Sequence, residues 1–244
     1  MVYRADLHIH SVLSPCADLE MSPVNIINKA KERKLDIIGI TDHNSTKQCK
    51  VTREIGEKNG IFVLCGAEVT TKEEVHCLTF FENIEKLAAF QSYIEIHLPK
   101  IKNDVQRFGY QLIVDENENI IDEEEFLLHS ALDVSVDALA EKVHELNGLF
   151  IPAHVNRPKF SLISQLGFIP PDIKADAFEI SKHLSREDFY KQFAYLKKKV
   201  VIQNSDAHFI DAIGEVFNEF ELQSVSFINI AKALINTDNN LMLK

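Results

Sequence analysis

Two histidines lie two positions apart near the start of the chain, in the run Asp6-Leu7-His8-Ile9-His10. In a β-strand, residues i and i+2 point to the same face, so both imidazoles project to one side and Ile9 to the other. Two imidazoles that converge at a strand end can chelate a divalent metal ion. A lone His-x-His also arises by chance near a surface terminus, so the interpretation needs support from the rest of the chain.

Four further strand-like runs also end in histidines or carboxylates. The runs 35–43, 61–68, 149–154 and 200–208 are short and apolar, and they close with Thr-Asp-His, Gly-Ala-Glu, Ala-His and Ser-Asp-Ala-His. An α/β barrel places its chemistry at the carboxyl ends of successive strands. Because buried charges rarely persist unpaired, five such endings in one chain indicate a shared metal site.

The elements between these endings favour an α/β fold. Ser22-Pro23 is a typical helix start, a second helix is expected over 46–58, and the chain thus begins β-α-β-α-β. This pattern predicts a single barrel domain over residues 1–244, with roughly seven parallel strands and outer helices. Residues 111–121, with an acidic tip, are expected to form a small hairpin outside the barrel wall.

The composition limits the partners and the location. The net charge of −11 argues against an extended nucleic-acid-binding surface, which would be basic. It does not exclude a small phosphorylated substrate, because bound metal ions supply local positive charge. The four cysteines form no Cys-x-x-Cys pair, and there is neither a signal peptide nor an apolar run near 18 residues. We therefore expect a cytoplasmic protein with reduced thiols and no membrane partner.

The five motifs, taken in order, resemble those of the PHP superfamily, named for bacterial DNA polymerase and histidinol phosphatase. They extend from residue 6 to residue 208 and so cover most of the chain. The resemblance implies a distorted (β/α)7 TIM-like barrel that carries two or three divalent metal ions, such as zinc, manganese or iron. It also implies hydrolysis of a phosphate ester by a metal-activated hydroxide. We expect a stand-alone enzyme acting on a small metabolite, a nucleotide or a short single-stranded oligonucleotide.

The resemblance also implies three groups of metal ligands. The first group is His8, His10, Glu68 and Asp206; the second is Glu68, His76 and His154, with Glu68 bridging; the third includes His43 and His208. His76 has the alternative interpretation of an ordinary strand histidine. For the third ion, Asp18 is the expected additional ligand from the loop after His10. Cys16 as a thiolate ligand, and a dinuclear site with no loop ligand, stay open as alternatives.

Residues outside the ligand groups are assigned to catalysis and substrate binding. Asp42 directly precedes a ligand, and we expect it to orient an imidazole rather than to transfer a proton. Arg157 is expected to clamp the phosphate through two hydrogen bonds, although a surface arginine is an equal alternative. Lys182 and His183 follow a strand end and are weaker candidates for substrate contact, and Glu179 is expected to orient them. Three histidines in helical or loop stretches are interpreted as surface residues: His97, His129 and His144.

Two other functions compete with the phosphoesterase. An amidohydrolase or deaminase also uses a histidine-rich barrel, but it usually carries a metal-bridging lysine, and no lysine lies at a suitable strand end. A non-catalytic, metal-stabilised module associated with nucleic-acid metabolism is the third possibility, and the intact set of candidate ligands argues against it.

Overall fold

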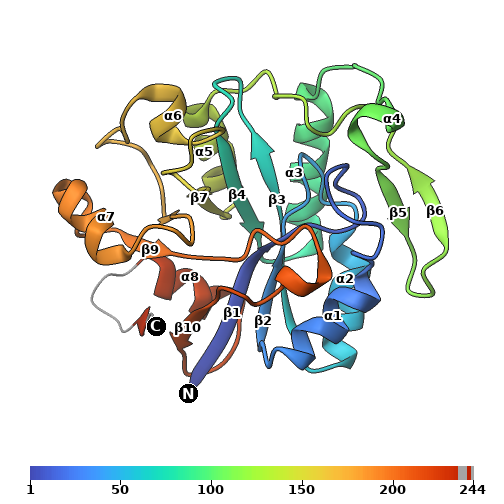
Figure 1. Ribbon diagram of the computed structural model, residues 1–244, viewed down its shortest axis with the longest axis horizontal. Coiled ribbons are helices and arrows are strands. Elements are labelled where there is room, and N and C mark those ends of the chain that lie inside the picture. The colour runs from blue at the N-terminus through green and yellow to red at the C-terminus, as the bar shows by residue number, and fades with distance from the viewer. Residues whose placement is uncertain (236–240, 243–244) are drawn as a thin grey trace.

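The computed structural model describes residues 1–235 and 241–242, and its largest sheet curls around a central core (Figure 1). That sheet has the strand order β11-β10-β1-β2-β3-β4-β7. Its strands are β1 (Val2–Ile9), β2 (Ile37–Ile40), β3 (Phe62–Thr70), β4 (His76–Phe81), β7 (Leu149–Pro152), β10 (Asn218–Glu221) and β11 (Leu241–Met242). The strands β1, β2 and β3 pair in parallel, as predicted from the initial β-α-β-α-β pattern.

A parallel pair, β8 (Ala177–Glu179) and β9 (Val200–Ile202), completes the ring. The backbone N–H of Asp176 donates to the carbonyl of Phe150 at 2.9 Å, which joins β8 to β7. Beyond β9, the N–H of Ala207 donates to the carbonyl of His8, and the N–H of His10 donates to Ala207. The strands β1, β2, β3, β4, β7, β8 and β9 therefore form an irregular closed ring, which confirms the distorted (β/α)7 TIM-like fold.

The prediction that all barrel strands are parallel is wrong for β4. This strand runs antiparallel to both β3 and β7. The reason is the loop between β3 and β4, residues 71–75, which contains no helix. A parallel pair needs a crossover of a dozen or more residues, so a five-residue loop can only form a hairpin.

Helices follow most of the strands and cover the outside of the ring (Figure 1). They are α1 (Pro23–Glu32), α2 (Cys49–Lys58), α3 (Ile84–His97), α4 (Val105–Phe108), α5 (Val136–Glu145), α6 (Leu162–Leu166), α7 (Arg186–Gln192) and α8 (Phe227–Ile235), with short 3-10 helices at Ala194–Leu196 and Ile210–Ala212. The predicted hairpin is present as β5 (Leu112–Val114) and β6 (Ile120–Glu123), and it stands apart from the main sheet. Among the described residues, no helix has both the length and the apolar character needed to cross a membrane.

The register of β1 aims its two histidines at the centre of the ring. Ala5 and Leu7 pack in a buried cluster with residues of β4 and β8, whereas Ile9 packs in a second cluster with residues of α1 and α2. The pairing of β1 with β2 shifts between Asp6 and Ile9. An irregularity of this kind re-aims side chains next to a functional site. Whether residues 1–244 form one domain stays a prediction.

Candidate metal centre

Buried histidines and carboxylates from different strands meet at one end of the ring. Four groups of potential ligand atoms have all their members within 4.8 Å of one another. The groups are His8, His10, Glu68 and Asp206; His43, Glu68 and His76; His10, His43 and His208; and Cys16, His43 and His129. The carboxyl ends of the parallel strands β1, β2 and β3 and the segment after β9 supply most of these residues, as expected for chemistry on a barrel. His76 instead begins β4, and Cys16 and His129 lie in the loops after β1 and before α5.

Glu68 lies at the centre of the cluster, and its side chain is only 1% exposed. Five imidazoles surround its two carboxylate oxygens. The nitrogen-to-oxygen distances are 3.4 Å from His8, 3.4 Å from His10, 3.1 Å from His43, 3.0 Å from His76 and 3.1 Å from His154. A carboxylate that has potential metal-binding imidazoles beside both of its oxygens is suited to bridge two cations. The position of Glu68 thus supports the bridging role that the sequence predicts.

Hydrogen bonds outside the cluster fix which nitrogen of each β1 histidine carries the proton. Nδ1 of His8 donates to both oxygens of Glu179 at 3.1 Å, so its Nε2 carries the lone pair. Nδ1 of His10 donates to Oγ of Ser14 at 3.0 Å, since that hydroxyl donates in turn to Asp42. Both lone pairs therefore face inward, as they do in histidines that bind metal ions.

The atoms of His8, His10 and Asp206 that face into the cluster are arranged to bind cations. The Nε2 atoms of His8 and His10 lie 3.2 Å apart, and Oδ1 of Asp206 lies 3.2 and 3.3 Å from them. That oxygen is buried and accepts no hydrogen bond. When the imidazoles are neutral, His8, His10, Asp206 and Glu68 all present acceptor atoms to one another and no donor. Only metal cations or added protons can hold these four groups together.

The pKa values describe the same charge balance in the absence of ions. Burial alone would lower the pKa of His10, but the carboxylates of Asp206 and Glu68, 3.3 and 3.4 Å from its Nε2, outweigh burial and raise that pKa to about 9. Burial would raise the pKa of Glu68, but the histidines around it hold that pKa well below its usual range. Burial and the nearby His10 lower the pKa of His208 to about 4, so this imidazole is neutral near pH 7 and can donate a lone pair to a metal ion.

Asp42 acts on the cluster through a serine rather than by direct contact. Its carboxylate accepts hydrogen bonds from the backbone and hydroxyl of Ser11 and from Oγ of Ser14, each at 2.7 Å. Ser14 accepts from the backbone N–H of His43 at 3.1 Å as well as from His10. These contacts agree with the expected orienting role of Asp42, which stays a prediction.

Two of the site residues adopt backbone conformations that non-glycine residues rarely take. His154 has a φ of 30° and Asp206 a φ of 51°. Such conformations cost of order 1–3 kcal/mol each and cluster at functional sites. Their presence at the ends of β7 and β9 indicates that the position of these side chains matters more than local backbone preference.

The rim of the cluster carries the predicted substrate-binding residues. A small cleft is lined by Arg157, Lys182 and His183 together with His154 and Asp206. Arg157 is 46% exposed and donates from Nη1 to Oδ2 of Asp206, whereas Nζ of Lys182 lies 3.2 Å from Glu215. Both cations thus lie beside the cluster of candidate ligands, and Arg157 is already paired with one of them.

The loop after β1 differs from the expectation. Asp18 is exposed, and its Oδ1 accepts a hydrogen bond from the backbone of Glu20 at 2.9 Å. Sγ of Cys16 instead lies 3.2 Å from Nε2 of His129. The arrangement therefore favours the alternative Cys16 and leaves Asp18 outside the cluster. The interpretation of His129 as a surface residue is wrong, because its ring is partly buried against His43.

Sequence reasoning underestimated Glu179 and did not identify Asn204. Glu179 was expected to orient Lys182 and His183, but it binds His8 and also accepts from the backbone N–H of His154 at 2.8 Å. Nδ2 of Asn204 donates to Glu179 at 2.7 Å, and its Oδ1 accepts from the backbone of Leu7. The position of Glu179 at the end of an apolar strand was the available signal. All metal-ligand assignments stay predictions.

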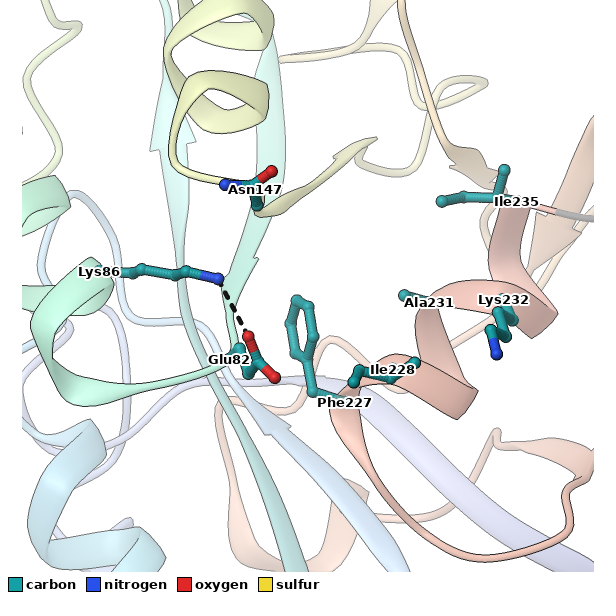
Figure 2. Close-up of a pocket in the computed structure, with 8 residues that line it drawn as sticks. All are labelled: Glu82, Lys86, Asn147, Phe227, Ile228, Ala231, Lys232 and Ile235. Atoms are coloured by element: carbon teal, nitrogen blue, oxygen red, sulfur yellow. Dashed lines mark hydrogen bonds and ion pairs between the residues drawn. The ribbon is translucent and has the colours of Figure 1, made fainter.

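A larger cavity, of about 660 Å³, lies at the other end of the ring, next to α8 (Figure 2). Phe227, Ile228 and Ile235 form its apolar side, and the ion pair between Lys86 and Glu82 lies opposite. No histidine or cysteine lines this cavity. It is therefore separate from the chemistry of the metal cluster.

One relative matches almost the whole of this chain. The chain is 24% identical over 271 residues to an uncharacterized protein, YqxK, of Bacillus subtilis strain 168, covering 98% of this chain and 63% of that protein. The chain therefore spans less than two thirds of the length of this relative.

Two solved structures share the fold. A lesion-specific endonuclease, PfuEndoQ from Pyrococcus furiosus, has a TM-score of 0.75 at 24% identity and covers 96% of this chain and 56% of its own. A Bifidobacterium adolescentis protein, assigned as a metal-dependent phosphoesterase, has a TM-score of 0.64 at 17% identity and covers 94% of this chain and 95% of its own.

The family model described as "PHP domain" matches residues 6–190, which is more than half of the chain. The matched region contains most of the candidate ligands, and the segment after β9 adds Asp206 and His208 just beyond it. On this match, together with the ring of strands and its cluster of histidines and carboxylates, the chain belongs to the PHP domain family.

Proposed function

We propose that this chain is a metal-dependent phosphoesterase that cleaves phosphodiester bonds in nucleic acid. The observation that carries the proposal is the convergence of the inward-facing lone pairs of His8 and His10 with the carboxylates of Glu68 and Asp206. Bound there, divalent ions would supply a nucleophile near neutral pH and positive charge for the phosphoryl oxygens.

The residues of this chain perform the remaining tasks. Glu179 and Ser14 hold the β1 histidines in the tautomers that bind metal ions. Arg157, at the rim, is placed to bind phosphoryl oxygens through two parallel hydrogen bonds and to neutralise their charge. Lys182 adds a second cation on the same side. These contacts favour a substrate with a phosphate group that enters from the rim.

Nucleic acid is the favoured substrate class because of the endonuclease likeness. The similar structure of endonuclease Q was determined in complex with a 27-mer duplex that has an abasic lesion at the active site. The acidic composition of this chain argues against a broad nucleic-acid surface. We therefore propose that recognition is local, at the metal cluster and its rim. The amidohydrolase alternative has less support, because the central residue of the candidate ligands is Glu68 and not a lysine.

The test compares phosphodiesters with phosphomonoesters. The purified chain would be supplied separately with manganese, zinc or iron and offered bis-p-nitrophenyl phosphate, p-nitrophenyl phosphate, and single-stranded and abasic duplex oligonucleotides. We expect metal-dependent cleavage of diesters that His10→Ala abolishes. The matched control is His144→Gln, since His144 bonds to Asp176 away from the cluster. Cleavage of monoesters alone would redirect the proposal to small-molecule phosphatases, and hydrolysis that persists in His10→Ala would contradict it.

A further inference from the structure

A thiol and two imidazoles meet beside the cluster in a combination that differs from its other ligand groups. Ligand atoms of Cys16, His43 and His129 all lie within 4.8 Å of one another, and Sγ of Cys16 is 3.2 Å from Nε2 of His129. The rings of His43 and His129 are 4.5 Å apart in an edge-to-face arrangement. No carboxylate belongs to this group, whereas carboxylates belong to the groups around Glu68.

The loop that carries His129 is held in place by the residue next to His43. Nδ2 of Asn44 donates to the carbonyls of Leu128 and Ser130 at 2.7 and 2.8 Å. Asn44 is fully buried, has a φ of 45°, and its Oδ1 accepts from the backbone of Thr70 at 3.1 Å. The two carbonyls flank His129, so one side chain fixes this histidine relative to His43.

The loop that carries Cys16 is pinned on both sides. Oγ of Ser14 bonds to Asp42 and His10, and the backbone N–H of Asp18 donates to the carbonyl of His208 at 2.9 Å. Gly109 adds a close approach, because a Cβ at that position would lie 2.1 Å from the carbonyl oxygen of Pro15. The thiol is therefore positioned by contacts on either side of it, as a preorganised ligand requires.

The spacing suits a bound ion. Zinc binds sulfur at about 2.3 Å and imidazole nitrogen at about 2.0–2.1 Å, which places tetrahedral ligand atoms about 3.5 Å apart. A thiolate with two neutral imidazoles selects zinc over magnesium, calcium or manganese.

We propose that Cys16, His43 and His129 form a zinc-selective site, which shares His43 with the group of Glu68 and His76 but has a thiol where that group has a carboxylate. When the ion binds, the thiol of Cys16 loses its proton to solvent and the sulfur–zinc bond forms, with no change in oxidation state. The ion joins the loop after β1 to the loop before α5 and so closes one side of the cluster. This proposal is independent of the substrate that the chain hydrolyses.

The first experiment uses the unaltered chain and the reactivity of its thiol. Cys16 is the only one of the four cysteines that is not fully buried, so an alkylating reagent should modify it selectively in the native, metal-free protein. We expect zinc to slow this modification at least about tenfold, while manganese leaves it unchanged. His129→Ala should remove most of the protection, because losing a ligand should weaken binding by at least the 10–100-fold that outer contacts contribute.

The second experiment observes the sulfur–metal bond directly. Cobalt-loaded protein should show the intense near-ultraviolet charge-transfer band of a thiolate–cobalt bond. Cys16→Ser should abolish that band and lower the zinc content by one ion per chain. Cys65→Ala is the matched control, since Cys65 is buried away from the cluster and should retain the band. Asn44→Ala should weaken the band by releasing the His129 loop.

Two results would overturn the proposal. One is a cobalt-loaded chain without a thiolate band. The other is alkylation of Cys16 at the same rate with and without zinc. Either result would identify the contact between Cys16 and His129 as a thiol–imidazole hydrogen bond only. Neither measurement involves hydrolysis, so an inactive but zinc-protected chain would refute the proposed phosphoesterase and leave this site intact.

Discussion

Replacing Glu68 with glutamine tests whether one carboxylate organises the whole metal centre. The substitution keeps the size of the side chain and removes its negative charge. In the structure, five imidazole nitrogens lie 3.0–3.4 Å from the two oxygens of Glu68. The amide nitrogen of glutamine would present a hydrogen-bond donor to the imidazoles that face one of the two carboxylate oxygens. The single remaining oxygen could not bridge two cations.

The size of the effect follows from Coulomb's law. At an effective dielectric constant near 20 and a separation of about 3.2 Å, a carboxylate and a dication attract each other by about 10 kcal/mol. The variant also avoids the cost of burying the carboxylate, which offsets more than half of this loss. A net loss of about 4 kcal/mol remains, equivalent to a dissociation constant about 1,000-fold weaker.

Thermal unfolding with increasing manganese or zinc measures this loss. At a metal concentration of about 100 times Kd, binding adds about 2.7 kcal/mol to the free energy of unfolding. For a chain of this length, that gain raises Tm by about 5–11 °C. Glu68→Gln should show a shift below about 1 °C at the same concentration.

The control variant for this experiment is Glu82→Gln, because Glu82 lies in the cavity next to α8 and not among the candidate ligands. It should retain the full metal-dependent rise in Tm. A rise of equal size in Glu68→Gln and in the unaltered chain would refute the bridging role. The ions would then bind without Glu68, and the five surrounding histidines would need another explanation.

Three further predictions concern residues around the cluster. Arg157→Ala should lower kcat/KM on a cleaved phosphodiester about tenfold to a hundredfold through lost charge-assisted hydrogen bonds, with partial recovery in Arg157→Lys; a parallel loss of metal content would show that Arg157 chiefly holds Asp206. Lys182→Ala should raise KM with little change in kcat, since Lys182 lies at the rim and is 46% exposed; an equal fall in kcat would contradict this role. Burial raises the pKa of Asp6 to about 6. The stability that its bound proton adds to the fold is therefore complete below about pH 4 and is lost as the pH rises through 6. In denaturant titrations of metal-free protein, the free energy of unfolding should fall between about pH 4.5 and 7.5, and this fall should be about 2 kcal/mol smaller in Asp6→Asn than in the unaltered chain.

The strand ends could be predicted because their signals are local. An apolar run closed by a histidine or carboxylate contains both the strand and its functional residue within a few positions, as at His8, His43 and Glu68. The two-residue period of a strand then places His8 and His10 together without knowledge of the rest of the fold. For this reason the structure brings His8 and His10 together with Glu68 in the first group that the resemblance implies, whereas the group of Glu68 and His76 contains His43 in place of His154.

The remaining features depend on contacts between distant parts of the chain. His129 reaches the cluster because Asn44, 85 positions earlier in the sequence, holds the carbonyls on either side of it. Glu179 faces His8 only once β8 and β9 have closed the ring between β7 and β1. The antiparallel direction of β4 did follow from a local feature, the short loop 71–75, which the repeated strand-and-helix pattern obscured.

The backbone at the cluster links metal binding to folding. His154 and Asp206 hold rare positive φ angles. These backbone conformations destabilise the metal-free chain by about 1–3 kcal/mol for each residue. Because an ion binds only the folded arrangement, its binding free energy offsets these costs directly. The same contacts that prepare the centre for chemistry should therefore make the stability of the ring depend on metal ions.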